Sequence, residues 1–155
     1  MELANHIKVE RCTALKSATK TEALHELLSL LENEIKPPEF DGVAKEIFYR
    51  EQIMSTGIGQ GIGIPHVRYP GIQEPILIVG IHPEGIADYA SLDDEPVCLI
   101  FLILVGADRH KEYLRLLSLL VSKLKTPGIR QKLHAAAQEE NAAQTIAKIL
   151  KENDS

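Results

Sequence analysis

Only two cysteines, Cys12 and Cys98, occur in this sequence of 155 residues. They are too few for a disulfide framework, and without a CxxC pair or Cys/His ligand spacing we expect neither a metal site nor a cofactor. The first residues lack the basic-then-apolar pattern of a signal peptide. The longest apolar run, residues 97–105, is far shorter than the roughly 20 residues that a membrane span needs. These absences predict a protein of the reducing cytoplasm that does not insert into a membrane.

An excess of positive charge is also missing, since 17 Lys and Arg stand against 22 Asp and Glu, for a net charge of −5. Proteins that bind nucleic acids present basic surfaces to the phosphates, so this balance argues against a generic nucleic-acid binder. The hydrophobic content of 45% is ordinary for a globular chain, and the length suffices to bury a core. We predict a single domain over residues 1–155, with no clear pattern in residues 1–16.

The first half of the chain carries two helical patterns. Leucines at helical spacing predict a helix over residues 21–35, with Thr21 as its N-cap. The proline pair that follows must end this helix, because a proline disfavours the helical conformation of the residue before it. A second helical pattern covers residues 40–54 and places Arg50 near its C-terminal end.

The second half begins with two nearly continuous apolar runs, residues 75–81 and 96–106, which predict strands covered on both faces. A long amphipathic helix is expected over residues 109–125, followed by two shorter helices over 129–138 and 141–153. The expected core face of the long helix consists of Leu114, Leu117, Leu120, Val121 and Leu124. Helices at both ends of the chain around buried strands indicate an α/β protein with a three-layer sandwich.

Glycine occupies every second position from residue 57 to residue 63, just before Ile64-Pro65-His66. The spacing excludes a dinucleotide fingerprint, and the absence of lysine between residues 45 and 111 excludes a P-loop. In an extended segment the bare side would admit another backbone or a bulky partner, while the isoleucines of the other side would dock on the core. The alternative is a glycine-rich hairpin or bulge that serves packing alone. Pro65 stiffens the exit and holds the imidazole of His66 in a defined direction.

Three segments closely resemble the signature of enzyme IIA of the mannitol/fructose type, including its nitrogen-regulatory branch, in the bacterial phosphotransferase system: Arg50-Glu51, Ser55-Thr56-Gly57-Ile58-Gly59 and Ile62-Gly63-Ile64-Pro65-His66. The likeness extends more loosely over almost the whole chain. It implies an α/β/α sandwich with a mixed, mostly parallel sheet. It also implies that His66 accepts a phosphoryl group from an HPr-type carrier and passes it to a cysteine of an enzyme IIB domain.

The resemblance assigns further residues to the phosphoryl site. Arg50 can donate paired hydrogen bonds to phosphoryl oxygens, and Thr56 lies in the same motif. The family usually carries a second histidine where this chain has Tyr113, whose hydroxyl can donate one hydrogen bond but carries no charge near pH 7. His110 lies about one helical turn earlier on the same face and is the other candidate to assist there. The alternative is a surface His110 and a Tyr113 that only packs.

Two functions follow from the resemblance, and both use His66. The first is a phosphocarrier in sugar uptake. The second is a regulatory module in which phosphorylation of His66 controls a partner kinase or transporter. The absence of fused membrane or enzyme IIB segments and the tyrosine at position 113 lean towards regulation. A third reading, a ligand-sensing domain without phosphoryl chemistry, conflicts with Arg50 and the Ile-Pro-His motif. The sequence names neither the sugar nor the oligomeric state.

Overall fold

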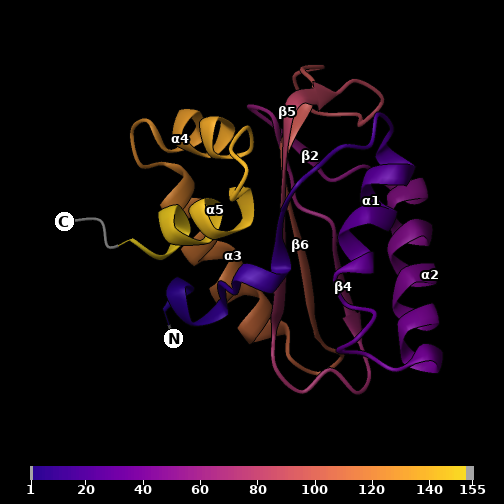
Figure 1. Ribbon diagram of the computed structural model, residues 1–155. Coiled ribbons are helices and arrows are strands. Elements are labelled where there is room, and N and C mark those ends of the chain that lie inside the picture. Colours follow the sequence, from indigo (N-terminus) through magenta and orange to yellow (C-terminus); the bar gives the residue numbers. More distant parts are fainter. Residues whose placement is uncertain (1, 153–155) are drawn as a thin grey trace.

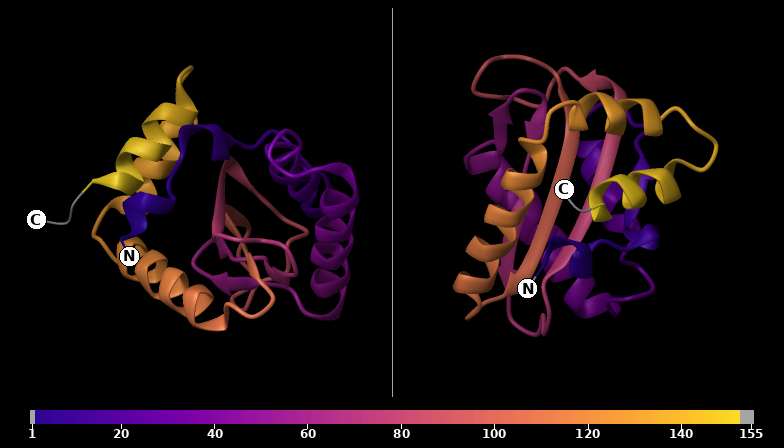
Figure 2. Two further views of the ribbon diagram at one scale, coloured as in Figure 1. Left: turned by 90° about the horizontal axis from the view of Figure 1, so that it is seen from below. Right: turned by 90° about the vertical axis from the view of Figure 1, so that its left-hand side faces the viewer.

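A computed structural model of the chain describes residues 2–152, in which one sheet is covered by helices on both faces (Figure 1). The strands are β1 (Cys12–Ala14), β2 (Gly57–Gly59), β3 (Ile62–Gly63), β4 (His66–Tyr69), β5 (Ile76–Ile86) and β6 (Val97–Gly106). The helices are α1 (Lys20–Ser29), α2 (Pro37–Ile53), α3 (His110–Leu124), α4 (Ile129–Ala136) and α5 (Ala142–Lys151), and short 3-10 turns cover Leu3–His6 and Val9–Arg11. The α1 and α2 helices lie on one side of the sheet, and α3, α4 and α5 lie on the other (Figures 1 and 2). The predicted three-layer sandwich is confirmed.

The strand order is β1-β5-β6-β3-β2, and β4 also pairs with β6. Among the described residues, three of the five strand pairings are parallel: β1 with β5, β3 with β6 and β4 with β6. The longest pairing, β5 with β6, is antiparallel, as is the β2–β3 hairpin. The mixed sheet is therefore confirmed, although its two longest strands run in opposite directions.

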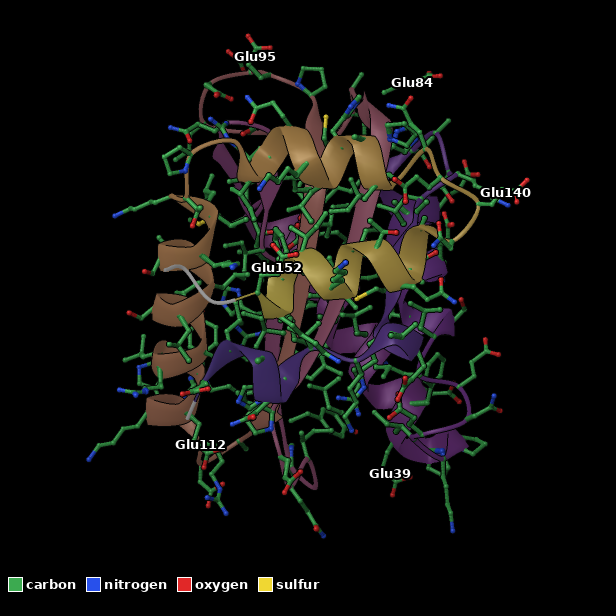
Figure 3. The ribbon with its side chains drawn as sticks, turned by 60° about the vertical axis from the view of Figure 1, so that its left-hand side comes forward. Glu39, Glu84, Glu95, Glu112, Glu140 and Glu152 are labelled. Atoms are coloured by element: carbon green, nitrogen blue, oxygen red, sulfur yellow. The ribbon has the colours of Figure 1, made fainter. Side chains whose placement is uncertain are left out.

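The two long strands bury both of their faces. Val79 and Phe101 pack with residues of α3, α4 and α5, whereas Ile78 and Leu102 pack with residues of α1 and α2. Each core therefore uses alternate residues of the same strands, which explains why both sequences are apolar almost without interruption. Charged side chains stay outside these layers, and Figure 3 shows glutamates projecting from the outline of the molecule, among them Glu39, Glu84, Glu95 and Glu140.

The start of α1 differs from the prediction. Thr19, and not Thr21, is the N-cap: its Oγ1 accepts a hydrogen bond of 3.2 Å from the Glu22 amide and donates one of 3.0 Å to the Glu22 carboxylate. Thr19 stands three residues before Glu22, at the spacing of a capping box. The α1 helix also ends at Ser29, earlier than expected, and α2 begins at Pro37, because proline is tolerated in the first turn of a helix.

The long helix α3 is confirmed, but part of its predicted core face is wrong. Leu116, Leu120 and Leu124 are buried, whereas Leu114 is 48% exposed. Leucines occupy so many positions of this helix that its sequence is compatible with two overlapping apolar faces, and the sheet contacts the one that contains Leu116. The two later helices are confirmed as α4 and α5, and residue 153, the last of the predicted range, lies outside the described residues.

The alternating glycines form a hairpin, so the prediction of one extended segment is wrong and the alternative is correct. The chain reverses at Gln60 and Gly61, whose φ angles of 59° and 76° are both left-handed, as a tight β-hairpin turn requires. The bare side faces the chain itself: a Cβ at Gly57 would lie 2.3 Å from the carbonyl oxygen of Ala90. A Cβ at Gly63 would lie 2.8 Å from the ring of Tyr89.

This packing predicts that Gly57→Ala destabilises the fold. The added methyl group must displace backbone of the neighbouring segment, and overpacking of this kind costs about 1–3 kcal/mol. Urea unfolding followed by circular dichroism measures the effect. The matched control is Ile58→Ala at the adjacent, 46% exposed position, for which we expect a change within about 0.5 kcal/mol. Equal losses in the two variants would contradict the close approach.

Candidate functional site

His66 lies where one line of strand is interrupted. Strands β3 and β4 both run along β6, and Ile64 and Pro65 separate them. Proline has no N–H to donate to a sheet, but the Pro65 carbonyl still accepts a hydrogen bond of 2.9 Å from the Ile103 amide. Among the described strands β4 pairs with β6 alone, so His66 stands half-buried at an open edge of the sheet.

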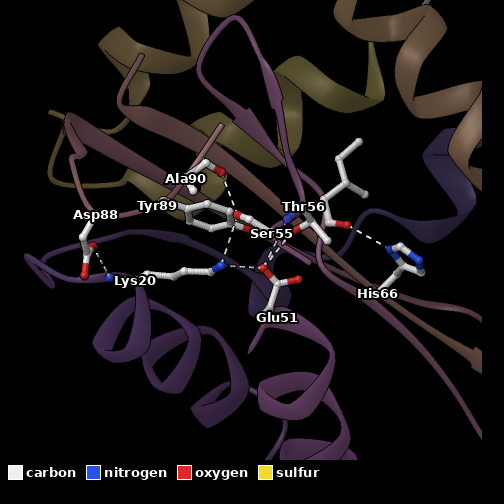
Figure 4. A network of polar contacts seen from close by, with 9 residues as sticks. Lys20, Glu51, Ser55, Thr56, His66, Asp88, Tyr89 and Ala90 are labelled. Atoms are coloured by element: carbon white, nitrogen blue, oxygen red, sulfur yellow. Dashed lines mark hydrogen bonds and ion pairs between the residues drawn. The ribbon is translucent and has the colours of Figure 1, made fainter. Parts of the chain in front are cut away.

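One hydrogen bond defines the tautomer of His66. Its Nδ1 lies 3.1 Å from the carbonyl oxygen of Ile64, as Figure 4 shows. A carbonyl oxygen can only accept, so Nδ1 carries the proton and donates it. In the neutral ring the lone pair then lies on Nε2, which makes Nε2 the nucleophilic atom of this side chain.

Tyr113, from the first turn of α3, packs against the ring of His66. The two ring centroids are 4.9 Å apart and the ring planes are inclined by 24°, a stacked arrangement. His110 contacts Tyr113, with centroids 6.2 Å apart, but within residues 2–152 it makes no ring contact or hydrogen bond with His66. Burial raises the pKa of the Tyr113 hydroxyl, so at neutral pH this hydroxyl is an uncharged donor.

Arg50 and His66 line the same pocket, whose volume is about 450 Å³. The other lining residues are Glu46, Tyr49, Glu51, Ile53, Met54, Ser55 and Thr56. Arg50 pairs through Nε with Glu46 at 3.1 Å, and 41% and 38% of the two side chains are exposed. Exposed pairs of this kind contribute only about 0.2–1 kcal/mol. The terminal guanidinium nitrogens have no partner elsewhere in the described chain, so Arg50 can turn to an anion in the pocket at little cost.

Thr56 lies in the wall of this pocket, and its hydroxyl is already engaged. Thr56 Oγ1 is 3.1 Å from a carboxylate oxygen of Glu51 and 2.6 Å from the hydroxyl of Tyr89. Glu51 is paired with Lys20, and its carboxylate can only accept. Thr56 therefore donates to Glu51, and Tyr89 donates to Thr56. The structure thus brings His66, Tyr113, Arg50 and Thr56 together, with the Thr56 proton directed away from the imidazole.

Sequence reasoning missed the polar network beneath the pocket (Figure 4). Lys20 Nζ lies 2.9 Å from Glu51 Oε1, with 15% and 5% of the two side chains exposed, and it donates to Ser55 Oγ at 3.2 Å. The same ammonium lies 4.5 Å from the ring centroid of Tyr89. Glu51 had one signal in the sequence, its place beside Arg50 in the motif. Lys20 and Tyr89 lie more than 30 residues away along the chain and had none.

Two absences concern only the described residues. Among residues 2–152, no three His, Cys, Asp or Glu side chains converge so that they could hold a metal ion. Over the same range, every helix is too short or too polar to cross a bilayer.

Comparison with known proteins identifies the family. The family model described as phosphoenolpyruvate-dependent sugar phosphotransferase system, EIIA 2, matches residues 5–149, and the chain belongs to this family. The chain is 34% identical over 133 residues to a nitrogen regulatory protein of Pseudomonas aeruginosa, covering 84% of each. It is 32% identical over 133 residues to a fructose-specific EIIA component of Haloferax volcanii, covering 86% of each. The solved nitrogen regulatory protein IIA-Ntr from Neisseria meningitidis matches with a TM-score of 0.79 and 28% identity, over 96% of this chain and 98% of that one.

The buried Tyr89 predicts a loss of stability at alkaline pH. Burial, together with the nearby Glu51 carboxylate, raises the pKa of Tyr89 in the folded chain above the value of about 10 of an unfolded tyrosine. This contribution to stability is complete below about pH 10 and is lost as the pH rises further, because the unfolded chain releases the proton first.

Unfolding in urea at about pH 8, 10 and 11 tests this sign. Tyr89→Phe removes the hydroxyl, so the variant should lose less stability than the wild type over this range, while lysines titrate equally in both. At neutral pH it should be less stable by about 1 kcal/mol, because Thr56 loses a donor. Parallel curves for the two proteins would refute the assignment.

Proposed function

We propose that His66 accepts a phosphoryl group at Nε2 from the phosphohistidine of an HPr-type carrier, of the sugar or the nitrogen branch, and passes it to a cysteine of an enzyme IIB domain in the cytoplasm. The observation that carries the proposal is the hydrogen bond from Nδ1 to Ile64, which leaves the lone pair on Nε2 at an open edge beside Arg50. Membership of the EIIA family supports the same reaction class.

The transfer requires no group beyond the two proteins. The Nε2 lone pair attacks phosphorus, the P–N bond of the donor breaks, and its electron pair returns to the donor ring. The ring of His66 becomes cationic, and its Nδ1–H donates more strongly to the Ile64 carbonyl. Arg50 stabilises the charge on the phosphoryl oxygens. In onward transfer a thiolate attacks phosphorus, the P–Nε2 bond breaks, and the electron pair returns to Nε2.

A second candidate is a regulatory module in which the phosphorylation state of His66 controls a partner kinase or transporter. The observation that favours it is Tyr113, an uncharged ring stacked on His66 where the family usually has a second histidine. The similarity to proteins named nitrogen regulatory protein supports it as well. Both candidates share the first step, so they differ only in how fast the phosphoryl group leaves.

The rim of the pocket favours a protein as the phosphoryl donor. Tyr49, Ile53 and Met54 line the pocket and are 58%, 65% and 74% exposed. Single exposed apolar residues are common, but a group of them around one polar site is typical of a surface that another protein covers. A small phosphorylated metabolite would leave this rim in water.

Phosphorylation itself is tested with phosphoenolpyruvate, enzyme I and each candidate carrier, followed by intact-mass measurement. We expect an acid-labile phosphoryl adduct on the wild type and none on His66→Ala. Arg50→Ala should slow its formation by about 100-fold while leaving the circular dichroism spectrum unchanged. The control Lys45→Ala removes an exposed cation from the same helix and should react at the wild-type rate. No adduct with any donor would overturn both candidate functions.

Docking by a protein donor is tested at Met54. Met54→Glu should slow transfer from the phosphorylated carrier by about 10-fold, because it puts a charge into the proposed contact. Phosphoramidate, a small donor that needs no docking surface, should phosphorylate this variant at the wild-type rate. The control is Leu92→Glu, which places the same charge at an 84% exposed leucine outside the pocket. Equal slowing with both donors would reject a docking role.

A further inference from the structure

Lys20 and Glu51 stand at helix ends where the macrodipole disfavours their charges. Lys20 is the first residue of α1, where a helix favours anions, and Glu51 lies in the last turn of α2, where a helix favours cations. Both side chains are largely buried, and a buried ion pair recovers little beyond what its desolvation costs. Neither helix stability nor net charge pairing therefore explains why these residues occupy these positions.

A continuous path of hydrogen bonds leads from this pair to His66 (Figure 4). Glu51 Oε1 accepts from the amide and the hydroxyl of Thr56, at 3.3 and 3.1 Å. The carbonyl of Thr56 accepts from the Ile64 amide at 3.0 Å. The carbonyl of Ile64 in turn accepts from Nδ1 of His66 at 3.1 Å. Each bond places the backbone group that makes the next one.

We propose that Glu51, held by Lys20, is a positioning residue for His66. It fixes Thr56 and through it the Ile64 carbonyl, which selects the tautomer with the lone pair on Nε2. This inference rests on the proposed function, because the tautomer matters when Nε2 takes up a phosphoryl group. The path acts by geometry and carries no proton, since the amide and the carbonyl of Thr56 belong to different peptide groups.

The charge of Glu51 is what makes it suited to this role. One carboxylate oxygen accepts from the Lys20 ammonium and from two groups of Thr56, and hydrogen bonds to an ionised acceptor are about twice as strong as neutral ones. Lys20 also donates to Ser55 Oγ, which donates to the carbonyl of Ala90 at 2.6 Å. The segment between α2 and the hairpin is thus anchored from two sides.

Two variants test the proposal. Glu51→Gln keeps the shape and removes the charge, and the double variant Lys20→Met with Glu51→Leu replaces the ion pair by apolar side chains of similar size, which buried sites often tolerate. The control is Glu34→Gln, which weakens the Arg11–Glu34 ion pair and leaves the path to His66 intact. Long-range ¹H–¹⁵N spectra report which ring nitrogen of His66 carries the proton, and phosphoramidate reports the reactivity of the ring without docking.

The proton of His66 should move partly from Nδ1 to Nε2 in both variants, more in the double one. Phosphorylation should slow by about 10-fold in Glu51→Gln and about 100-fold in the double variant, as misplacement of a reacting group predicts. Glu34→Gln should match the wild type in both measurements. A folded Glu51→Gln chain with the wild-type tautomer and rate would overturn the proposal. A tautomer shift in a protein that no donor phosphorylates would uphold the positioning by Glu51 and overturn the proposed function instead.

Discussion

The geometry of the site depends on the hydrogen bond between Nδ1 of His66 and the carbonyl of Ile64. This carbonyl is free for a side chain because the strand is interrupted here, with Pro65 unable to donate to the sheet. The two flanks of the interruption are nevertheless fixed. The Ile64 amide donates to Thr56, and the Pro65 carbonyl accepts from Ile103 in the buried centre of β6. The imidazole thus takes its orientation from the most rigid strand of the sheet while standing at its edge.

The glycines serve this arrangement from behind. The hairpin brings Thr56 beside Ile64, and the absence of side chains at Gly57 and Gly63 lets the segment that contains Tyr89 and Ala90 pack directly on it. That close approach places the Tyr89 hydroxyl on Thr56. The bare side of the glycine run was expected to admit a partner, and it admits the protein's own loop. A partner must therefore approach His66 from the pocket side, where the apolar rim lies.

Features encoded by neighbouring residues could be predicted from the sequence. The long apolar strands, the helices and the pairing of Arg50 with His66 in one motif all depend on local pattern, and the structure agrees with them. The β1 strand has only three residues and is defined by its parallel pairing with β5, which no local pattern records. The hairpin turn was hidden for another reason, because Gln60 is not a residue type that signals a left-handed conformation. The roles of Lys20 and Tyr89 arise only when distant segments meet.

Tyr113 bears on how long a phosphoryl group would stay on His66 in the proposed reaction. A ring phosphorylated on Nε2 with a proton on Nδ1 is cationic, and a cation over an aromatic face is stabilised by roughly 0.5–2 kcal/mol. The stacking seen here, with centroids 4.9 Å apart, provides such a face. A protonated histidine in the same place would instead put a like charge beside the ring. Tyr113 therefore lowers the free energy of the phosphorylated form relative to a charged neighbour. Slower release of the phosphoryl group is what a regulatory mark requires, so this contact connects the departure from the family pattern to the regulatory candidate.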